Sequence, residues 1–227
     1  MGVMWRIEGF IEGFVGVDRR SVILGVCLLV VPLVLYSCRS VGLGGLEKAK
    51  YTVVRKEGAF EIREYASQIV AETVVDAGFD EAGNVAFRRL YGYISGANRT
   101  KASIAMTAPV EQQKTSEKIA MTAPVEQVGS GGQYTVSFMM PGEYTMATLP
   151  EPTDPAVRLR EIPGRTMAAV RYSGTWSQKR YERKKASLET FIAEQGLSVV
   201  GEDVFARYDP PFQLWFLRRN EVLVPVE

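Results

Sequence analysis

The stretch IREYASQIVAET, residues 62–73, decides the fold, because the chain repeats its outline as LREIPGRTMAAV at residues 159–170. Both copies are rich in β-branched and apolar residues, as strands are. A segment with helical spacing follows each copy. Three apolar positions keep the same spacing in both segments: Leu90, Tyr93 and Ile94, then Leu188, Phe191 and Ile192. Two strand–helix–strand–strand units in one sheet system are the simplest fold that fits this repeat.

Further helices and strands are predicted on either side of these two stretches. Two helices are predicted, one from Asp80, as its cap, to Ser95, and one from Ser177 to Gln195. Gly96 and Gly196 follow them as stop signals. The predicted strands are YTVVRK at 51–56, FEIREY at 60–65, IVAETVV at 69–75, QYTVSFMM at 133–140, QLWFLR at 213–218 and EVLVPV at 221–226.

One string occurs twice in tandem, as SIAMTAPVEQ at 103–112 and KIAMTAPVEQ at 118–127. Apolar and small residues alternate in each copy, which predicts short strands whose proline marks an edge or an end. Duplication of a hairpin arm explains the tandem copies.

Composition excludes several classes of function. The chain has 27 basic and 26 acidic residues and a net charge of +1, so no nucleic-acid partner is expected. It has no histidine, and its two cysteines, Cys27 and Cys38, lie in or beside an N-terminal apolar segment. Neither a Ser–His–Asp nor a Cys–His set can form. We therefore expect no metal site, no catalytic set and no enzyme activity.

The N-terminal region, residues 1–38, predicts a signal or membrane-anchor segment. Arg19 and Arg20 precede the uncharged run SVILGVCLLVVPLVLYS at 21–37, which is shorter than the roughly 20 residues of a spanning helix. LYSC at 35–38 resembles a bacterial lipobox, which would place a lipid on Cys38. An uncleaved, apolar signal-anchor helix is the alternative.

Either form of anchor places the folded domain on the non-cytoplasmic side of a bacterial cell envelope, associated with the membrane. A Gly-rich and charged linker is expected at 39–50, and the domain at 51–227. We expect this domain to be a monomer.

Six motifs resemble the SOUL haem-binding family: EIREY at 61–65, FRRLYGYISGAN at 87–98, KIAMTAPVEQ at 118–127, VSFMMP at 136–141, VRYSG at 170–174 and ARYDPPFQLWFLRRNEV at 206–222. They lie in the family's order and cover nearly all of residues 51–227. The resemblance implies an α+β fold, a distorted β-barrel or curved antiparallel sheet of two βαββ repeats with two main helices.

The same resemblance implies a non-covalently bound tetrapyrrole such as haem. Haem is a flat apolar disc with two carboxylates, so its site needs an apolar face and basic groups. The first helix supplies candidates for both. The candidate contact residues are Phe87, Arg88, Leu90, Tyr91 and Ile94, with Met121 and Met140. Alternatively, Leu90, Tyr93 and Ile94 pack into the sheet and the arginines are solvated.

Without histidine, a tyrosine or a methionine could serve as the axial ligand to the iron. We expect apolar contact and propionate pairing to hold the ligand instead. Arg218 and Arg219 are either a propionate clamp or partners of Glu221 that fix the last strands. Two further alternatives are binding of another small amphiphilic molecule and a hydrolase that uses Glu64, Glu72 and Tyr172.

Overall fold

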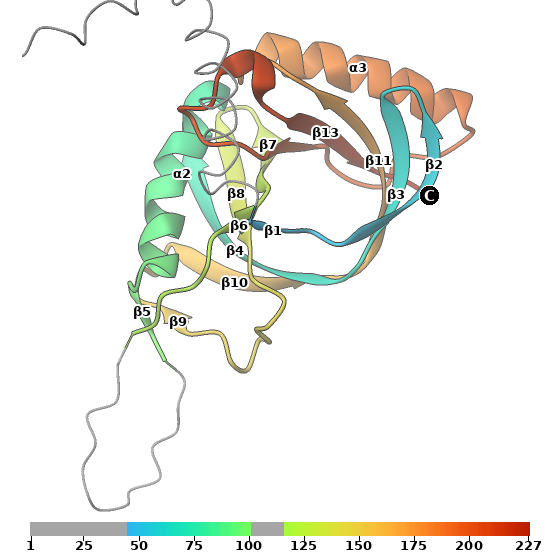
Figure 1. Cartoon of the computed structure of the whole chain (residues 1–227). Coiled ribbons are helices and arrows are strands. Elements are labelled where there is room, and N and C mark those ends of the chain that lie inside the picture. Colours follow the sequence, from blue (N-terminus) through green and yellow to red (C-terminus); the bar gives the residue numbers. More distant parts are fainter. Residues whose placement is uncertain (1–44, 101–115) are drawn as a thin grey trace, which may run out of the picture. The chain divides into compact units, whose positions relative to one another are not determined.

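A curled, nine-stranded antiparallel sheet carries the fold of this computed structural model, which describes residues 45–100 and 116–227 (Figure 1). The strand order is β10-β4-β8-β7-β12-β13-β11-β3-β2. The strands are β2 (Tyr51–Glu57), β3 (Phe60–Tyr65), β4 (Gln68–Asp76), β7 (Val125–Ser130), β8 (Gln133–Met139), β10 (Val157–Ile162), β11 (Arg165–Tyr172), β12 (Val204–Arg207) and β13 (Asn220–Pro225). Residues Leu46–Glu227 form one compact unit.

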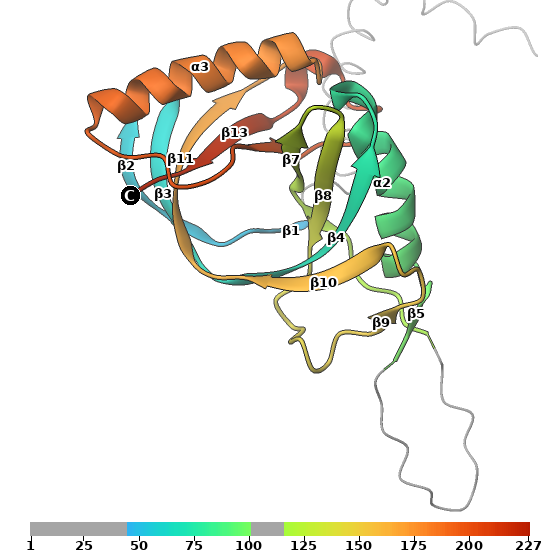
Figure 2. The ribbon, with the colours of Figure 1, turned by 180° about the vertical axis from the view of Figure 1, so that it is seen from behind.

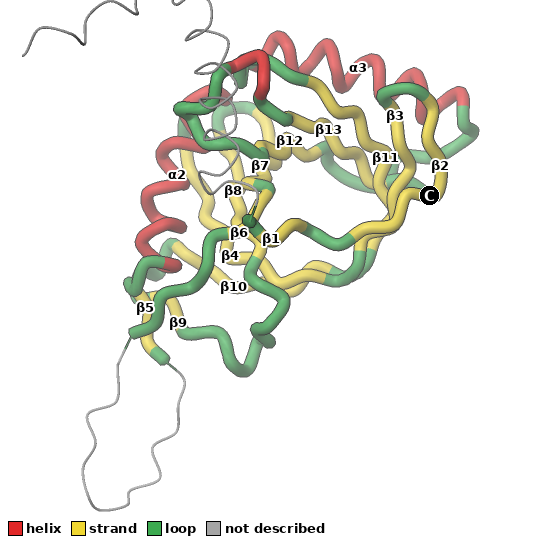
Figure 3. Tube along the Cα trace, viewed as in Figure 1, coloured by secondary structure: helices red, strands yellow, loops and turns green. Residues whose placement is uncertain are grey.

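Two helices lie outside the curl, α2 (Phe79–Ile94) and α3 (Gln178–Glu194) (Figure 3). Two short strand pairs lie outside the main sheet. They are β1 (Glu47–Lys48) with β6 (Thr122–Ala123), and β5 (Asn98–Arg99) with β9 (Glu151–Pro152). The predicted α+β class, curved antiparallel sheet and two main helices are confirmed.

The two predicted repeats are interleaved in the sheet. The first contains β3, β4, α2, β7 and β8, and the second contains β10, β11, α3, β12 and β13. The first strand of each repeat pairs with the second strand of the other, β3 with β11 and β10 with β4, while β7 and β12 meet at the seam. Figure 2 shows the arcs in which β3 continues into β4 and β10 into β11.

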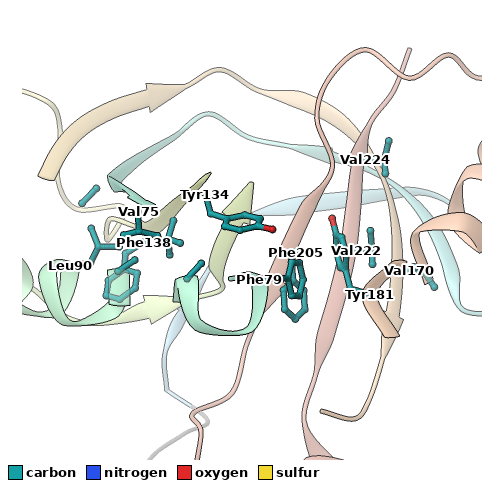
Figure 4. Close-up of a cluster of buried hydrophobic side chains, with 14 of the residues drawn as sticks. Val75, Phe79, Leu90, Tyr134, Phe138, Val170, Tyr181, Phe205, Val222 and Val224 are labelled. Carbon is teal, nitrogen blue, oxygen red and sulfur yellow. The ribbon is translucent and has the colours of Figure 1, made fainter. Parts of the chain in front are cut away.

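Strand alternation gives the sheet an outer face, which the helices cover, and an inner face inside the curl. α2 packs on β4 and β8, and α3 packs on β11 and β13. On β11, Val170 points to the outer core and Ala169 to a smaller inner cluster. Figure 4 shows Phe79 of α2 beside Phe205 of β12, where the rings stack at 5.4 Å.

The helix ends agree with the predicted stop signals but not with the predicted cap. Gly96 and Gly196 follow the helices with positive φ, at +120° and +69°. The N-cap of α2 is Gly78, and Asp80 lies in the first turn. The Asp80 carboxylate instead accepts a hydrogen bond from the backbone N–H of Gln178, at 3.2 Å.

The prediction of a strand at 213–218 is wrong. Residues Trp215–Leu217 form a 3₁₀ helix, η1, and β13 begins only at Asn220. The segment closes on itself, because the N–H of Leu217 donates to the carbonyl of Leu214 at 2.9 Å and Arg218 Nε donates to the carbonyl of Gln213 at 2.9 Å. Those local bonds replace the ladder bonds that a strand requires.

The apolar segment at 21–37, Cys38 and the 103–112 copy of the duplicated string lie outside the described residues. Within residues 45–100 and 116–227, neither helix combines the length and apolarity needed to cross a membrane.

Candidate functional site

The exposed side of α2 carries a stacked aromatic pair. The rings of Phe87 and Tyr91, one helical turn apart, lie 5.7 Å from each other at 11°. Phe87 also meets Phe138 of β8 edge-on at 5.4 Å, which fixes the pair against the sheet. Tyr91 remains 51% exposed, so an aromatic face is presented to solvent.

The other predicted residues of α2 divide between core and solvent. Leu90 and Ile94 are buried in the outer core, which agrees with the alternative in which they pack into the sheet. Arg88 is exposed and forms no ion pair with the described residues. Arg89 donates to the Thr73 hydroxyl at 3.5 Å and to the Val74 carbonyl at 3.3 Å.

A depression of about 420 Å³ lies at the C-terminal end of α2. Its walls come from α2 and from the second IAMTAPVEQ copy: Tyr91, Ile94, Ser95, Lys118, Ile119 and Met121. The N–H of Ile119 donates to the carbonyl of Ile94 at 2.8 Å and holds the two segments together. The depression thus unites three predicted residues, Tyr91, Ile94 and Met121, with a lysine.

Met140 lies elsewhere. It is buried in the outer core and borders a different depression, of about 410 Å³, together with Ile69 and Tyr144.

Two arginines flank the ring of Trp176, on the side of the Phe87–Tyr91 pair that lies away from the depression. The Cζ atoms of Arg207 and Arg218 lie 5.3 Å and 4.4 Å from the Trp176 ring centroid. Trp176 Nε1 donates to Asn220 Oδ1 at 2.9 Å, which fixes the ring. A Cβ on Gly83 of α2 would lie 1.7 Å from Arg207 Nη2, so the guanidinium packs directly on the helix backbone.

The segment before Arg218 forms an exposed apolar loop. Its apolar side chains are each more than half exposed: Phe212, Leu214, Trp215, Phe216 and Leu217. A contiguous group of this kind is a typical contact surface for an apolar partner.

Of the two roles considered for Arg219, the structure shows the pairing with Glu221. Its guanidinium donates to Glu221 at 2.8 Å, and Arg63 donates to the other Glu221 oxygen at 2.7 Å. Burial by itself raises the pKa of the fully buried Glu221 carboxyl. The two arginines outweigh it and hold that pKa below its ordinary value.

The inner face has its own polar depression, of about 500 Å³. Glu72 there accepts two hydrogen bonds from Arg160, and Glu126 lies 3.8 Å from Arg165. Burial raises the pKa of Glu126 despite that arginine. Within the described ranges, no three His, Cys, Asp or Glu residues cluster as metal ligands.

The three residues of the hydrolase alternative are not brought together. Glu72 borders the inner depression, whereas Tyr172 lies in the outer core and Glu64 is exposed on β3.

Two basic residues of this region were not predicted. Lys118 directly precedes the second IAMTAPVEQ copy, where the first copy has Ser103, and its place in the motif KIAMTAPVEQ was the available signal. Arg207 lies inside the motif ARYDPPFQLWFLRRNEV at 206–222, where only Arg218, Arg219 and Glu221 were assigned roles. Only the pairing of β12 with β7 turns Arg207 toward α2.

Comparisons with known proteins agree with this fold. The family model described as SOUL heme-binding protein matches residues 46–225. Mouse (Mus musculus) heme-binding protein 2 is 28% identical over 184 residues, covering 77% of this chain and 85% of that protein. Heme-binding protein 1 of Xenopus tropicalis is 28% identical over 189 residues, covering 78% and 95%.

Solved structures share the architecture at low identity. The EcmrR C-terminal domain has a TM-score of 0.52 at 13% identity, covering 78% of this chain and 98% of that domain. A hydrolase from Listeria innocua has a TM-score of 0.53 at 12% identity, covering 77% and 94%. These likenesses concern the fold alone. The family model, in contrast, spans most of the sequence, and this chain belongs to the SOUL heme-binding protein family.

Proposed function

We propose that this protein binds haem or a related tetrapyrrole, without a covalent bond, on the exposed side of α2. The observation that carries the proposal is the Phe87–Tyr91 stack beside the depression at Met121. A flat macrocycle gains most from a flat aromatic surface next to an apolar hollow. Membership of the SOUL family and the names of the two heme-binding relatives support this ligand class.

The residues of this surface fit the chemistry of the ligand. Ile119 and Met121 line the apolar part of the hollow, and Lys118 lies at its edge. Arg88 is exposed on α2, three residues before Tyr91. A cation at one end of this surface can pair with the carboxylates of the ligand. No imidazole is available anywhere in the chain, since the sequence has no histidine. Apolar contact and carboxylate pairing therefore carry most of the affinity in this proposal.

A titration of the purified full-length chain with haemin, followed by the Soret band, tests the proposal. Tyr91→Ala and Met121→Ala should each weaken binding about tenfold, because burying such a side chain contributes roughly 1.5–3 kcal/mol and 1.4 kcal/mol corresponds to tenfold. Val54→Ala is the control, since Val54 of β2 is 58% exposed, much like Tyr91, and does not line the depression. The absence of a saturable Soret change in the wild-type chain would contradict haem binding.

Iron-free protoporphyrin IX tests the absence of a strong axial ligand. Without a strong axial ligand the iron adds little to binding, so we expect the affinity for protoporphyrin IX to equal that for haemin within about threefold. A threefold difference corresponds to about 0.6 kcal/mol. A much tighter haemin complex that weakens in Tyr91→Phe would instead assign the Tyr91 oxygen to the iron.

We also propose that residues 1–38 attach the protein to a bacterial envelope membrane. The uncharged run at 21–37 after Arg19 and Arg20 supports this location. Cys38→Ser, followed by membrane fractionation and mass measurement, separates the two anchors. A lipid on Cys38 requires that the mass of the membrane-bound form changes by far more than the exchange of sulfur for oxygen, whereas an intact helix leaves only that exchange.

A further inference from the structure

Arg207 is a buried cation without a counter-charge. Its side chain extends from β12 onto the outer face, and the residue is 6% exposed. Its one hydrogen bond to a described residue runs from Nη2 to the amide oxygen of Gln127, at 3.1 Å, and Nε has no partner. Burial lowers the pKa of Arg207 to about 10. Holding a charge in this way costs free energy unless an anion compensates it.

Two polar groups near Arg207 also lack hydrogen-bond partners. The Tyr172 hydroxyl and Arg180 Nε are buried without a hydrogen-bond partner. Burial raises the pKa of Tyr172, and the charges of Arg180 and Arg207 act on it in the opposite direction, so both arginines lie near this hydroxyl. Arg218 shares the Trp176 ring with Arg207. None of the three arginines forms an ion pair with a carboxylate of the described residues.

This cluster lies in line with the aromatic pair on α2. The guanidinium of Arg207 rests on Gly83, and Gly83, Phe87 and Tyr91 follow one another at four-residue steps along one helix face. At a rise of 1.5 Å per residue, Gly83 and Tyr91 are about 12 Å apart along the axis. A cation therefore lies toward each end of the stripe, Arg207 at Gly83 and Lys118 beside Tyr91.

We propose that Arg207, with Arg180 and Arg218 beside it, forms the carboxylate-binding end of the site. This inference rests on the proposed function and adds an orientation to it. The two propionates of a natural haem leave the same edge of the ring, so one end of the stripe takes both. The Arg207 end is favoured because its cation is already desolvated and lacks an anion, whereas Lys118 is exposed to water.

The test compares haemin with haemin dimethyl ester, which has the same ring and no carboxylates. The wild-type chain should bind haemin at least tenfold more tightly than the ester. Arg207→Met should abolish this preference and leave ester binding unchanged. Lys118→Met is the matched control and should keep the preference. If Arg207→Met keeps it, or if Lys118→Met alone loses it, the proposed orientation is overturned.

Arg218→Met provides a second test, because Arg218 is less buried and its removal disturbs less packing. It should reduce the preference for haemin by several-fold, and an unchanged preference in this variant contradicts a role for the cluster. In the absence of porphyrin, Arg207→Met should unfold at an equal or higher temperature than the wild type, since the uncompensated charge is removed. A large fall in that temperature would make Arg207 a structural residue and overturn the inference. Failure of the wild-type chain to bind either porphyrin would instead reject the proposed function.

Discussion

At the scale of single residues, the inner face is organised by one carboxylate. Glu221 has no exposed surface, and it accepts hydrogen bonds from Arg63, Arg219 and the Tyr208 hydroxyl. The three donors come from β3, from the residue before β13 and from the segment after β12, so one side chain joins β13 to the end of β12 and, across β11, to β3. A buried ion group contributes little when compared with an apolar replacement, but loss of one member leaves the others unpaired.

Glu221→Ala should therefore destabilise the protein strongly, by about 3–5 kcal/mol. Urea unfolding followed by far-UV circular dichroism measures the loss. Glu72→Ala, which breaks the more exposed pair with Arg160, is the control and should cost no more than about 1 kcal/mol. Equal losses in the two variants would contradict the difference that burial is expected to make.

The same carboxylate predicts a dependence on pH. The pKa of Glu221 is lowered in the folded protein, so its stabilising contribution is fully present above the unfolded pKa. That contribution is lost as the pH falls through the folded pKa.

Ionisation of Glu126 has the opposite effect on stability. Burial raises its pKa in the folded protein, so its ionisation opposes folding at neutral pH. Glu126→Gln should raise the free energy of unfolding at pH 7, and the gain should disappear below pH 4, where both side chains are neutral. Urea titrations at several pH values check this. A variant that is less stable at pH 7 would mean that the pair with Arg165 outweighs the burial of Glu126.

At the scale of elements, α2 contains two glycines in unlike surroundings. Gly83 lies under the guanidinium of Arg207, while a Cβ on Gly92 would meet nothing within 4 Å. Helix propensity favours alanine over glycine by about 1 kcal/mol at an interior position. The same substitution is thus expected to have opposite effects at two positions of one helix.

Gly92→Ala should stabilise the protein by about 0.5–1 kcal/mol. Gly83→Ala should destabilise it by about 1–3 kcal/mol, because the new methyl group displaces the guanidinium of Arg207, which is only 6% exposed and is packed among other buried groups. Thermal unfolding of both variants measures the difference. If Gly83→Ala is as stable as Gly92→Ala, Arg207 does not pack on α2 as described.

The two helices and most strands could be predicted from the sequence, since their apolar residues recur at regular spacing. The loop at 212–217 was misassigned, because consecutive apolar residues favour a buried strand and the sequence does not show that these side chains stay exposed. Of the candidate site, Tyr91, Ile94 and Met121 share a depression. Arg207 could not be found, because its role depends on which strand β12 pairs with and on a glycine in a distant helix.

At the scale of the molecule, neither repeat has a complete sheet of its own. The edge of the first repeat is covered by β10 from the second, and β3 of the first covers β11 of the second. Separate fragments of residues 46–150 and 151–227 should each be largely unfolded, as judged by circular dichroism. An equimolar mixture should recover ordered structure. A fragment that folds alone would contradict the dependence of each repeat on the other.

This interleaving has a consequence for how such a molecule can arise. A shorter chain that encoded a single repeat would complete the sheet only by meeting a second copy of itself, and its folding would depend on its concentration. Joining two copies end to end makes that encounter intramolecular. Each half can then change independently, and the two helices accordingly carry different side chains. The first carries the aromatic pair, and the second carries the basic run KRYERKK at 179–185.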